Sequence, residues 1–237
     1  MAFGKIYTFG PTFRAEKSKT RRHLSEFWMI EPEMAFYDIF MNMDMIEGML
    51  KHVVNAVIKD CNDELVVIER NVEALKNISK QFPRITYDEA IEILKGTKAV
   101  NGKTSVEVLN EDLKLVNENI AIAQNEIAER EAKIAGGTLK QGEVNFNQNK
   151  ISGLQKEIAE LTDKAQNIPN WLRSAQEFEY GNDLGGSDET VITRLFDTPI
   201  LVYNWPHEVK AFYLKRKDRK STRLNSSHRC ISYAVFC

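Results

Sequence analysis

Polar and apolar residues alternate along two segments near the start of the chain, a pattern that predicts paired β-strands. From Glu26 onward, side chains two residues apart share one face of the predicted strand. One face carries the candidate functional residues Phe27, Met29, Glu31 and Glu33. The other carries residues expected to pack: Trp28, Ile30, Pro32 and Met34. In the preceding segment, Thr12, Arg14 and Glu16 lie opposite Phe9 and Phe13. The polar residues 17–23 form a connection short enough for an antiparallel hairpin.

The spacing of apolar residues then changes to three and four, which predicts amphipathic helices. The first is expected over 38–59 and the second over 65–79. Thr86 followed by Glu89 is a capping-box pattern, so a third helix is expected to begin there and to end at Gly96. These helices are expected to cover one face of a sheet.

From Gly102 to about Ile168 the chain is rich in Asn, Gln, Glu and Lys, with two apolar repeats of four and three. The repeats are separated by Gly136, Gly137 and Gly142, and they predict an antiparallel coiled-coil hairpin. Arms of roughly 25 residues would extend on the order of 40 Å. The predicted seam consists of Leu109, Leu113, Val116, Ile120, Ala123 and Ile127 on one arm and Ile151, Leu154, Ile158, Leu161, Ala165 and Ile168 on the other. Mixed charges at the other positions favour a solvated arm, while contact with a partner stays open.

Composition limits the possible classes of protein. The 237 residues are 43% hydrophobic, which suits one sizeable core with an appended or inserted segment. The net charge of −2 gives no overall basic surface for nucleic acid, so any such contact would be local. No run approaches the roughly 20 apolar residues of a membrane span, and no signal peptide is evident, so the chain is expected to be cytoplasmic without a membrane partner. The three cysteines show neither metal-ligand nor disulfide spacing.

Two ordered motifs point to a family. Within Tyr7–Phe36, the string FRAE, a basic loop, RHLSEF and EPE together resemble motif 2 of a class II aminoacyl-tRNA synthetase of the asparaginyl type. The segment 181–216 is similar to the part of the family that follows motif 2, through DLGGSDE and PILVYNWPHEVKAFY. The resemblance implies an α+β fold: a partial class II antiparallel sheet flanked by helices, with the helical hairpin as an insertion.

The resemblance also implies a reaction. Asparagine would be activated by ATP to an aminoacyl-adenylate with release of pyrophosphate, and then transferred to the tRNA for asparagine. ATP and Mg²⁺ would be required, and the parent enzyme would be a homodimer. No metal ligand is expected in this chain, because the acids that bind Mg²⁺ in the family lie in a later segment without a counterpart here.

Five residues are expected to bind the nucleotide. Arg14 would hold the α-phosphate and the attacking carboxylate and stabilise charge on phosphorus, which makes it the catalytic candidate. Arg22 and His23 would contact the β- and γ-phosphates. Phe27 would stack on adenine, and Glu16 would accept a hydrogen bond from an exocyclic amine of adenine or of the terminal tRNA base. Taken singly, Arg14 with Glu16 is also typical of a surface ion pair.

Four residues are expected at the amino-acid pocket. Glu31 and Glu33 would fix an ammonium or amide group, and by resemblance Glu189 and Lys210 lie near the amino-acid and nucleotide pockets. An interfacial lysine with no role in binding is the competing interpretation of Lys210.

The expected organisation has four parts. Residues 1–97 and 177–217 would be two parts of the catalytic core, and 98–176 the helical insertion between them. Residues 218–237 are expected to be a non-native tail, because DRKSTRLNSSH matches a reading frame of a common sequencing-library adapter. Motifs 1 and 3 and the anticodon-reading domain of the family have no counterpart, so the chain is expected to be a fragment that is inactive alone.

Three other interpretations stay open. The chain would also suit an aspartyl-type synthetase, or a synthetase-like asparagine synthetase without an anticodon domain. A truncated paralogue whose helical hairpin serves as an interaction module is the third. Exchange assays with asparagine against aspartate separate the first two from an asparaginyl enzyme, and ATP binding tests the last.

Overall fold

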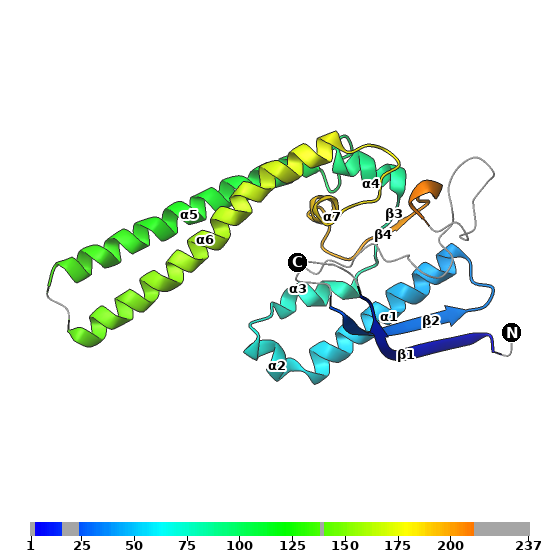
Figure 1. Ribbon diagram of the computed structural model, residues 1–237, viewed down its shortest axis with the longest axis horizontal. Helices are drawn as coiled ribbons and strands as arrows, with labels where there is room; N and C mark the ends of the chain where they lie inside the picture. The colour runs from blue at the N-terminus through cyan, green and yellow to red at the C-terminus, as the bar shows by residue number, and fades with distance from the viewer. Residues whose placement is uncertain (1–2, 16–23, 138–139, 211–237) are drawn as a thin grey trace.

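The computed structural model describes residues 3–15, 24–137 and 140–210 and combines short strands with helices, including a long two-helix arm (Figure 1). The strands are β1 (Lys5–Phe13), β2 (Glu26–Met34), β3 (Arg84–Thr86) and β4 (Leu201–Tyr203). The α-helices are α1 (Ile39–Asp60), α2 (Asn62–Val67), α3 (Val72–Lys76), α4 (Tyr87–Leu94), α5 (Ser105–Ala135), α6 (Gln141–Glu177) and α7 (Gly186–Thr193). Two 3₁₀ turns, η1 (Asn77–Ser79) and η2 (His207–Val209), complete the order.

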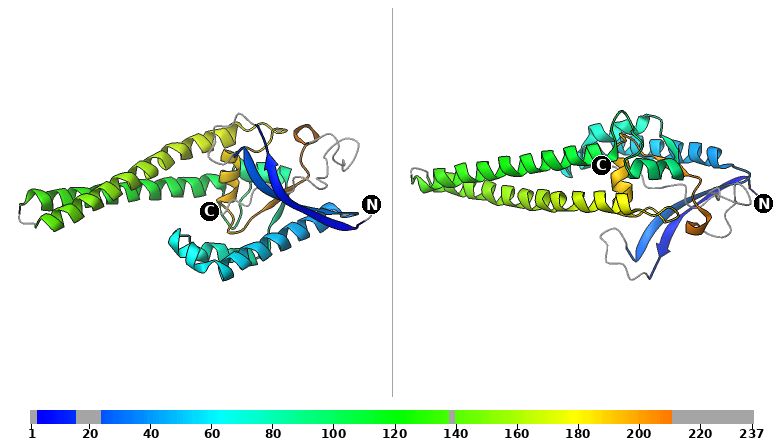
Figure 2. Two further views of the ribbon diagram at one scale, coloured as in Figure 1. Left: turned by 60° about the horizontal axis from the view of Figure 1, so that its bottom comes forward. Right: turned by 90° about the horizontal axis from the view of Figure 1, so that it is seen from above.

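The predicted hairpin is present as the antiparallel pair β1–β2, with Thr12 opposite Phe27 and Phe9 opposite Ile30. Figure 2 shows it lying to one side of the helical arm. The side expected to pack is open to solvent: Phe9 is 64% and Trp28 62% exposed, and their rings meet with centroids 5.0 Å apart. The alternation therefore predicted the strands, but no other described segment covers this face.

The first predicted helix is confirmed as α1, which Asp38 caps by accepting a hydrogen bond from the Met41 amide at 2.8 Å. The single helix expected over 65–79 is wrong. The structure divides that region into α2, α3 and η1, because Glu69 has a left-handed backbone (φ 54°) and Asn71 caps a new helix through the Ala74 amide. The spacing of apolar residues alone does not indicate that one helix ends at this turn and another begins after it.

The third predicted helix is confirmed as α4, with a complete capping box between Thr86 and Glu89. Gly96 follows its end with φ 74°, a left-handed conformation that favours glycine. A Cβ at this position would lie 2.7 Å from the Val106 Cγ2 atom. Close packing of this turn against the start of α5 therefore also requires the missing side chain.

The two long helices α5 and α6 lie side by side and antiparallel (Figures 1 and 2). At 31 and 37 residues they would extend about 46 and 55 Å. Every residue of the predicted seam is buried or half-buried. At the base, Leu109 and Ile168 join the main core, whereas Val116 and Ala123 are buried further along the arm outside that cluster.

The main core lies where α4, α7, β3, β4 and the base of the arm meet. The short strands β3 and β4 pair in parallel and form a sheet separate from β1–β2. A second apolar cluster packs α1 against Phe82 and Leu201. The main core places the start of α4, the end of α6 and the end of β4 next to one another, which positions the side chains considered below.

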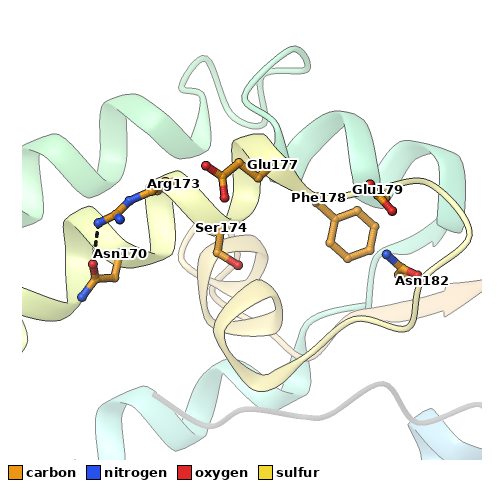
Figure 3. Close-up of a pocket in the computed structure, with 7 residues that line it drawn as sticks. All are labelled: Asn170, Arg173, Ser174, Glu177, Phe178, Glu179 and Asn182. Atoms are coloured by element: carbon orange, nitrogen blue, oxygen red, sulfur yellow. Dashed lines mark hydrogen bonds between the residues drawn. The ribbon is translucent and has the colours of Figure 1, made fainter.

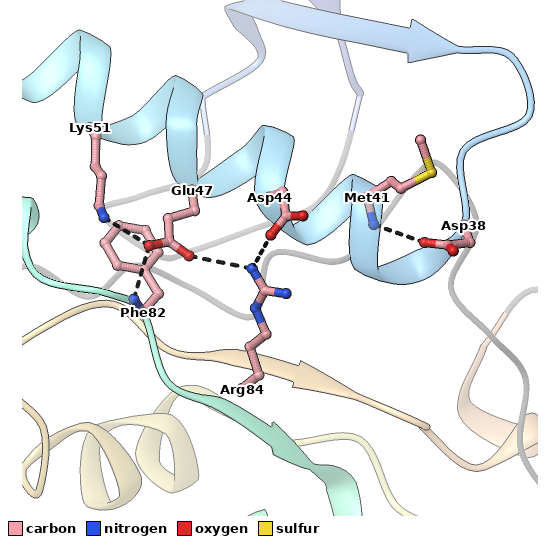
Figure 4. A network of polar contacts seen from close by, with 7 residues as sticks. All are labelled: Asp38, Met41, Asp44, Glu47, Lys51, Phe82 and Arg84. Carbon is pink, nitrogen blue, oxygen red and sulfur yellow. Dashed lines mark hydrogen bonds and ion pairs between the residues drawn. The ribbon is translucent and has the colours of Figure 1, made fainter.

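A polar network joins α1 to β3 (Figure 4). The Arg84 guanidinium donates to Asp44 and lies 3.5 Å from Glu47 Oε2. Glu47 also accepts from Lys51 Nζ at 2.8 Å and from the Phe82 amide at 3.2 Å. These contacts tie the helix that follows the hairpin to the strand that leads into α4.

Candidate nucleotide and amino-acid site

Arg14 and Phe27 are brought together at the end of the hairpin where β1 connects to β2. The Arg14 amide donates to the Ser25 carbonyl at 2.9 Å, which continues the ladder one step beyond the last strand pair. The guanidinium carbon lies 5.6 Å from the Phe27 ring centroid, within the range of a cation–π contact. A permanent cation thus lies beside a flat apolar ring on one face of the hairpin.

Glu31 and Glu33 extend the same face, as the alternation predicted for the strand. Glu31 is half-buried and accepts a hydrogen bond from Thr8 Oγ1 at 3.2 Å, while Glu33 is exposed opposite Ile6. At about 3.3 Å per residue, Phe27 and Glu33 are roughly 20 Å apart along the strand. The face therefore carries a cation and a ring at one end and carboxylates toward the other.

Three of the predicted nucleotide-binding residues, Glu16, Arg22 and His23, lie outside the described residues. Their roles stay predictions.

Lys210 follows β4 in the chain, and its ammonium group contacts two other side chains. Its Nζ atom is 3.0 Å from Asp183 Oδ1 and 3.7 Å from the centroid of the Trp205 ring. Only 9% of the lysine side chain is exposed. The ammonium is thus held by a carboxylate and an aromatic face, and its role in substrate binding stays a prediction.

Asp183 and Trp205 were not among the predicted site residues, although both lie in quoted motifs, DLGGSDE and PILVYNWPHEVKAFY. Their separations from Lys210 are 27 and 5 residues. Neither separation follows a helix or strand period, so periodicity gave no signal for them. The one available signal was that both motifs belong to the same block of resemblance.

Glu189 lies half-buried in the first turn of α7. Its backbone amide donates to the Gly185 carbonyl at 3.0 Å. The neighbouring Asp188 accepts from the Gly185 amide at 2.9 Å and so closes the loop onto the helix start. In the described part of the chain, Lys210 follows β4 of the β3–β4 sheet, whereas Arg14 directly follows β1 of the separate β1–β2 sheet. Their union in one pocket stays a prediction.

The hydroxyl groups of two tyrosines connect the loop that carries Asp183 to the start of α4. Tyr87 is fully buried; its hydroxyl donates to the Asn182 carbonyl at 2.7 Å and accepts from the Gly181 amide at 3.2 Å. Burial raises the pKa of Tyr87. Tyr180 donates to Asp88 Oδ1 at 2.8 Å, and this hydrogen bond, together with burial, raises the pKa of Tyr180 to about 12. Both hydroxyls therefore stay protonated near neutral pH.

An open hollow of about 510 Å³ lies at the end of α6 (Figure 3). Its lining is polar and mixed in charge: Asn170, Arg173, Ser174, Glu177, Phe178, Glu179 and Asn182. Arg173 Nη2 donates to Asn170 Oδ1 at 2.8 Å. None of the predicted site residues lines this hollow, so it is distinct from the candidate site.

Within the three described ranges, no group of three or more His, Cys, Asp and Glu residues could hold a metal ion. The Mg²⁺ that the resemblance implies stays part of the proposed function. In the same ranges, no helix is both long and apolar enough to cross a membrane.

The sequence matches the family described as tRNA synthetases class II (D, K and N) over residues 1–237. The asparagine–tRNA ligase of Sorangium cellulosum is 38% identical over 215 residues, covering 91% of this chain and 34% of that protein. The asparagine–tRNA ligase of Koribacter versatilis is 36% identical over 221 residues, covering 93% of this chain and 34% of that protein. The chain thus spans about a third of the length of the curated relatives that it matches.

Among solved structures, the fold is similar to asparaginyl-tRNA synthetase from Pyrococcus horikoshii complexed with asparaginyl-adenylate. The TM-score is 0.57 at 26% identity, and the match covers 94% of this chain and 34% of the other. The predicted mixed helix-and-strand fold of the class II type is confirmed by this match.

Proposed function

The chain belongs to the class II tRNA synthetases (D, K and N), and from this premise we propose that it forms part of the catalytic core of an asparagine–tRNA ligase. The proposed reaction joins asparagine to the α-phosphate of ATP, with release of pyrophosphate, and then transfers the amino acid to the tRNA for asparagine. The similarity to asparagine–tRNA ligases at 36–38% identity supports the choice of amino acid.

The observation that carries the proposal is the pairing of Arg14 with Phe27 on one hairpin face. Adenine would stack on Phe27, and the Arg14 guanidinium would lie at the adjoining α-phosphate. In-line attack by the asparagine carboxylate needs both groups held in position and the growing charge on phosphorus stabilised. A planar guanidinium supplies both functions without transferring a proton.

The amino-acid pocket is proposed to combine the carboxylates Glu31 and Glu33 with Glu189 and Lys210. Carboxylates suit the ammonium and amide groups of asparagine as hydrogen-bond acceptors. Lys210, held by Asp183 and Trp205, would supply a fixed positive charge. Glu16, Arg22 and His23 complete the proposed nucleotide contacts.

The wider setting follows from the same proposal. ATP, asparagine and tRNA are the proposed partners of a cytoplasmic, homodimeric parent enzyme that uses Mg²⁺. Residues 1–97 and 177–217 are the proposed parts of its catalytic core, and 98–176 the insertion. Residues 218–237 are proposed to be foreign to the enzyme.

The proposal is tested by asparagine-dependent exchange of pyrophosphate into ATP, using the full-length enzyme and its Arg14→Ala variant. We expect the variant to lose activity by about 10²–10³-fold, the effect of removing one preorganised donor to developing charge. Circular dichroism should be unchanged, because the Arg14 side chain lies on the exposed surface.

Lys5→Ala is the matched control, since it removes a cation from the other end of the same hairpin, where Lys5 lies over Tyr37. It should retain exchange activity. An Arg14→Ala enzyme as active as the wild type would exclude the role of Arg14.

A further inference from the structure

The loop Tyr180–Gly185, here called the acidic loop, is held from the start of α4 by two hydroxyl contacts. Tyr87 is the first residue of α4, and its hydroxyl both donates to the Asn182 carbonyl and accepts from the Gly181 amide. Tyr180, in the loop itself, donates back to Asp88, the second residue of the helix. The backbone on the amino-terminal side of Asp183 is therefore fixed to a helix end.

Tyr87 also supports the second neighbour of Lys210. Its ring centroid lies 5.1 Å from that of Trp205. The Trp205 indole N–H donates to the Val202 carbonyl at 3.0 Å, which holds the ring against β4. Lys210 Nζ lies over the Trp205 ring and contacts Asp183. One buried tyrosine thus touches both the loop and the ring that hold the lysine.

The helix end that carries Tyr87 is itself well determined. The capping box between Thr86 and Glu89 fixes the first turn of α4, and Lys98 Nζ donates to Glu89 at 2.7 Å. Gly181 has φ 99°, a conformation that other residues rarely adopt, and its amide points to the Tyr87 hydroxyl. The hydroxyl therefore contributes to holding the acidic loop in this backbone geometry.

We propose that Tyr87 is a positioning residue that fixes Asp183 and Trp205 around Lys210 and thereby sets the affinity of the pocket for its amino-acid substrate. This inference rests on the proposed function, because it assigns Lys210 to the amino-acid pocket. Tyr87 does not touch substrate in this account; it acts through the acidic loop.

The test compares the full-length enzyme with its Tyr87→Phe variant in asparagine-dependent pyrophosphate exchange. Phenylalanine keeps the buried ring and its contact with Trp205 and removes only the hydroxyl. We expect KM for asparagine to rise about tenfold with kcat changed less than about twofold, the pattern for weakened ground-state binding. A merely structural role would lower the active fraction and therefore kcat, with KM unchanged.

Tyr203→Phe is the matched control. It removes a hydroxyl from a half-buried tyrosine of β4 whose ring meets Phe40 rather than the acidic loop. A second control is Tyr87→Phe in an Asp183→Asn background. If the hydroxyl acts through Asp183, its removal should have little further effect there, because effects on one network are not additive.

Hydrogen exchange of the backbone amides of Tyr180–Gly185 provides a readout that does not depend on activity. It should be faster in Tyr87→Phe and unchanged in Tyr203→Phe. Unchanged KM and unchanged amide exchange in Tyr87→Phe, with an active wild type, would overturn the positioning role while leaving the proposed function standing. A wild-type enzyme without asparagine-dependent exchange would overturn the proposed function and, with it, the effect of Tyr87 on substrate affinity.

Discussion

At the scale of single residues, Glu47 shows how a partly buried carboxylate is kept ionised. Burial by itself raises the pKa of Glu47, but the hydrogen bonds from Lys51 and the Phe82 amide, with the charge of Lys51 and the contact to Arg84, lower it below 4.5. The hydrogen bond with Asp44 in turn raises the pKa of Arg84. Glu47 and Arg84 are therefore both charged at neutral pH, and the network that they form links α1 to β3 (Figure 4).

A pH dependence of stability follows. Since the pKa of Glu47 is lower in the folded state, its contribution is fully present above the unfolded value of about 4.5 and is lost as the pH falls through the lower folded value. Glu47→Gln should cost about 1.5–3 kcal/mol of unfolding free energy at neutral pH, the range for hydrogen bonds to a charged group. The difference from wild type should shrink below pH 4.5.

Urea unfolding at neutral and acidic pH measures this difference. Glu157→Gln on the exposed side of α6 is the control and should have little effect at either pH. A cost of Glu47→Gln that is the same at both pH values would show that the charge of Glu47 contributes nothing to the fold.

The candidate site was predictable at this scale only where a motif or strand alternation applied. Alternation placed Phe27, Glu31 and Glu33 on one face, and the structure adds Arg14 beside Phe27. The partners of Lys210 could not be predicted in the same way. Asp183 reaches it from a loop with no periodic pattern, and the backbone of that loop is hydrogen-bonded to Tyr87, which is 96 residues before Asp183 in the chain.

At the scale of elements, capping residues and turns set the helix boundaries that the spacing of apolar residues could not predict. The capping box of α4 and the seam of the arm were predictable because each follows a local rule. The region 65–79 was not, because the left-handed Glu69 and the Asn71 cap interrupt a stretch whose apolar spacing continues through it. The parallel pairing of β3 with β4 joins segments more than 100 residues apart and gives no signal in either three-residue strand.

The arm divides into a base within the core and an outer part that packs on itself. Leu109, Ile168 and Ala175 belong to the main core, and Arg130 is tied to Asn147 across the outer part by a 3.0 Å hydrogen bond. Replacing residues 120–157 by a short glycine–serine turn should leave pyrophosphate exchange within about twofold of wild type, as expected for distant, independent sites.

The control for this truncation is a longer one that also removes residues 109–168, which should destabilise the enzyme because it empties two fully buried core positions. A large loss of exchange activity in the shorter truncation would show that the outer arm is coupled to the adenylation site.

At the scale of the whole molecule, two features stand apart from the core. The arm projects in one direction, and the hairpin lies to one side (Figure 2). The exposed face of the hairpin carries the aromatic residues Phe9 and Trp28. The candidate residues are divided between this hairpin and the β3–β4 region, which the described structure keeps in separate sheets. In the proposed function, both groups serve one reaction, the activation of asparagine.

The amino-acid selectivity of the full-length enzyme tests whether the two groups share this role. Pyrophosphate exchange into ATP should be measured with asparagine and, separately, with aspartate. We expect exchange with asparagine, little with aspartate, and loss of the asparagine signal in both Arg14→Ala and Lys210→Met, one substitution in each group. Exchange with aspartate alone, or full asparagine activity in either variant, would show that the two groups do not serve this reaction together.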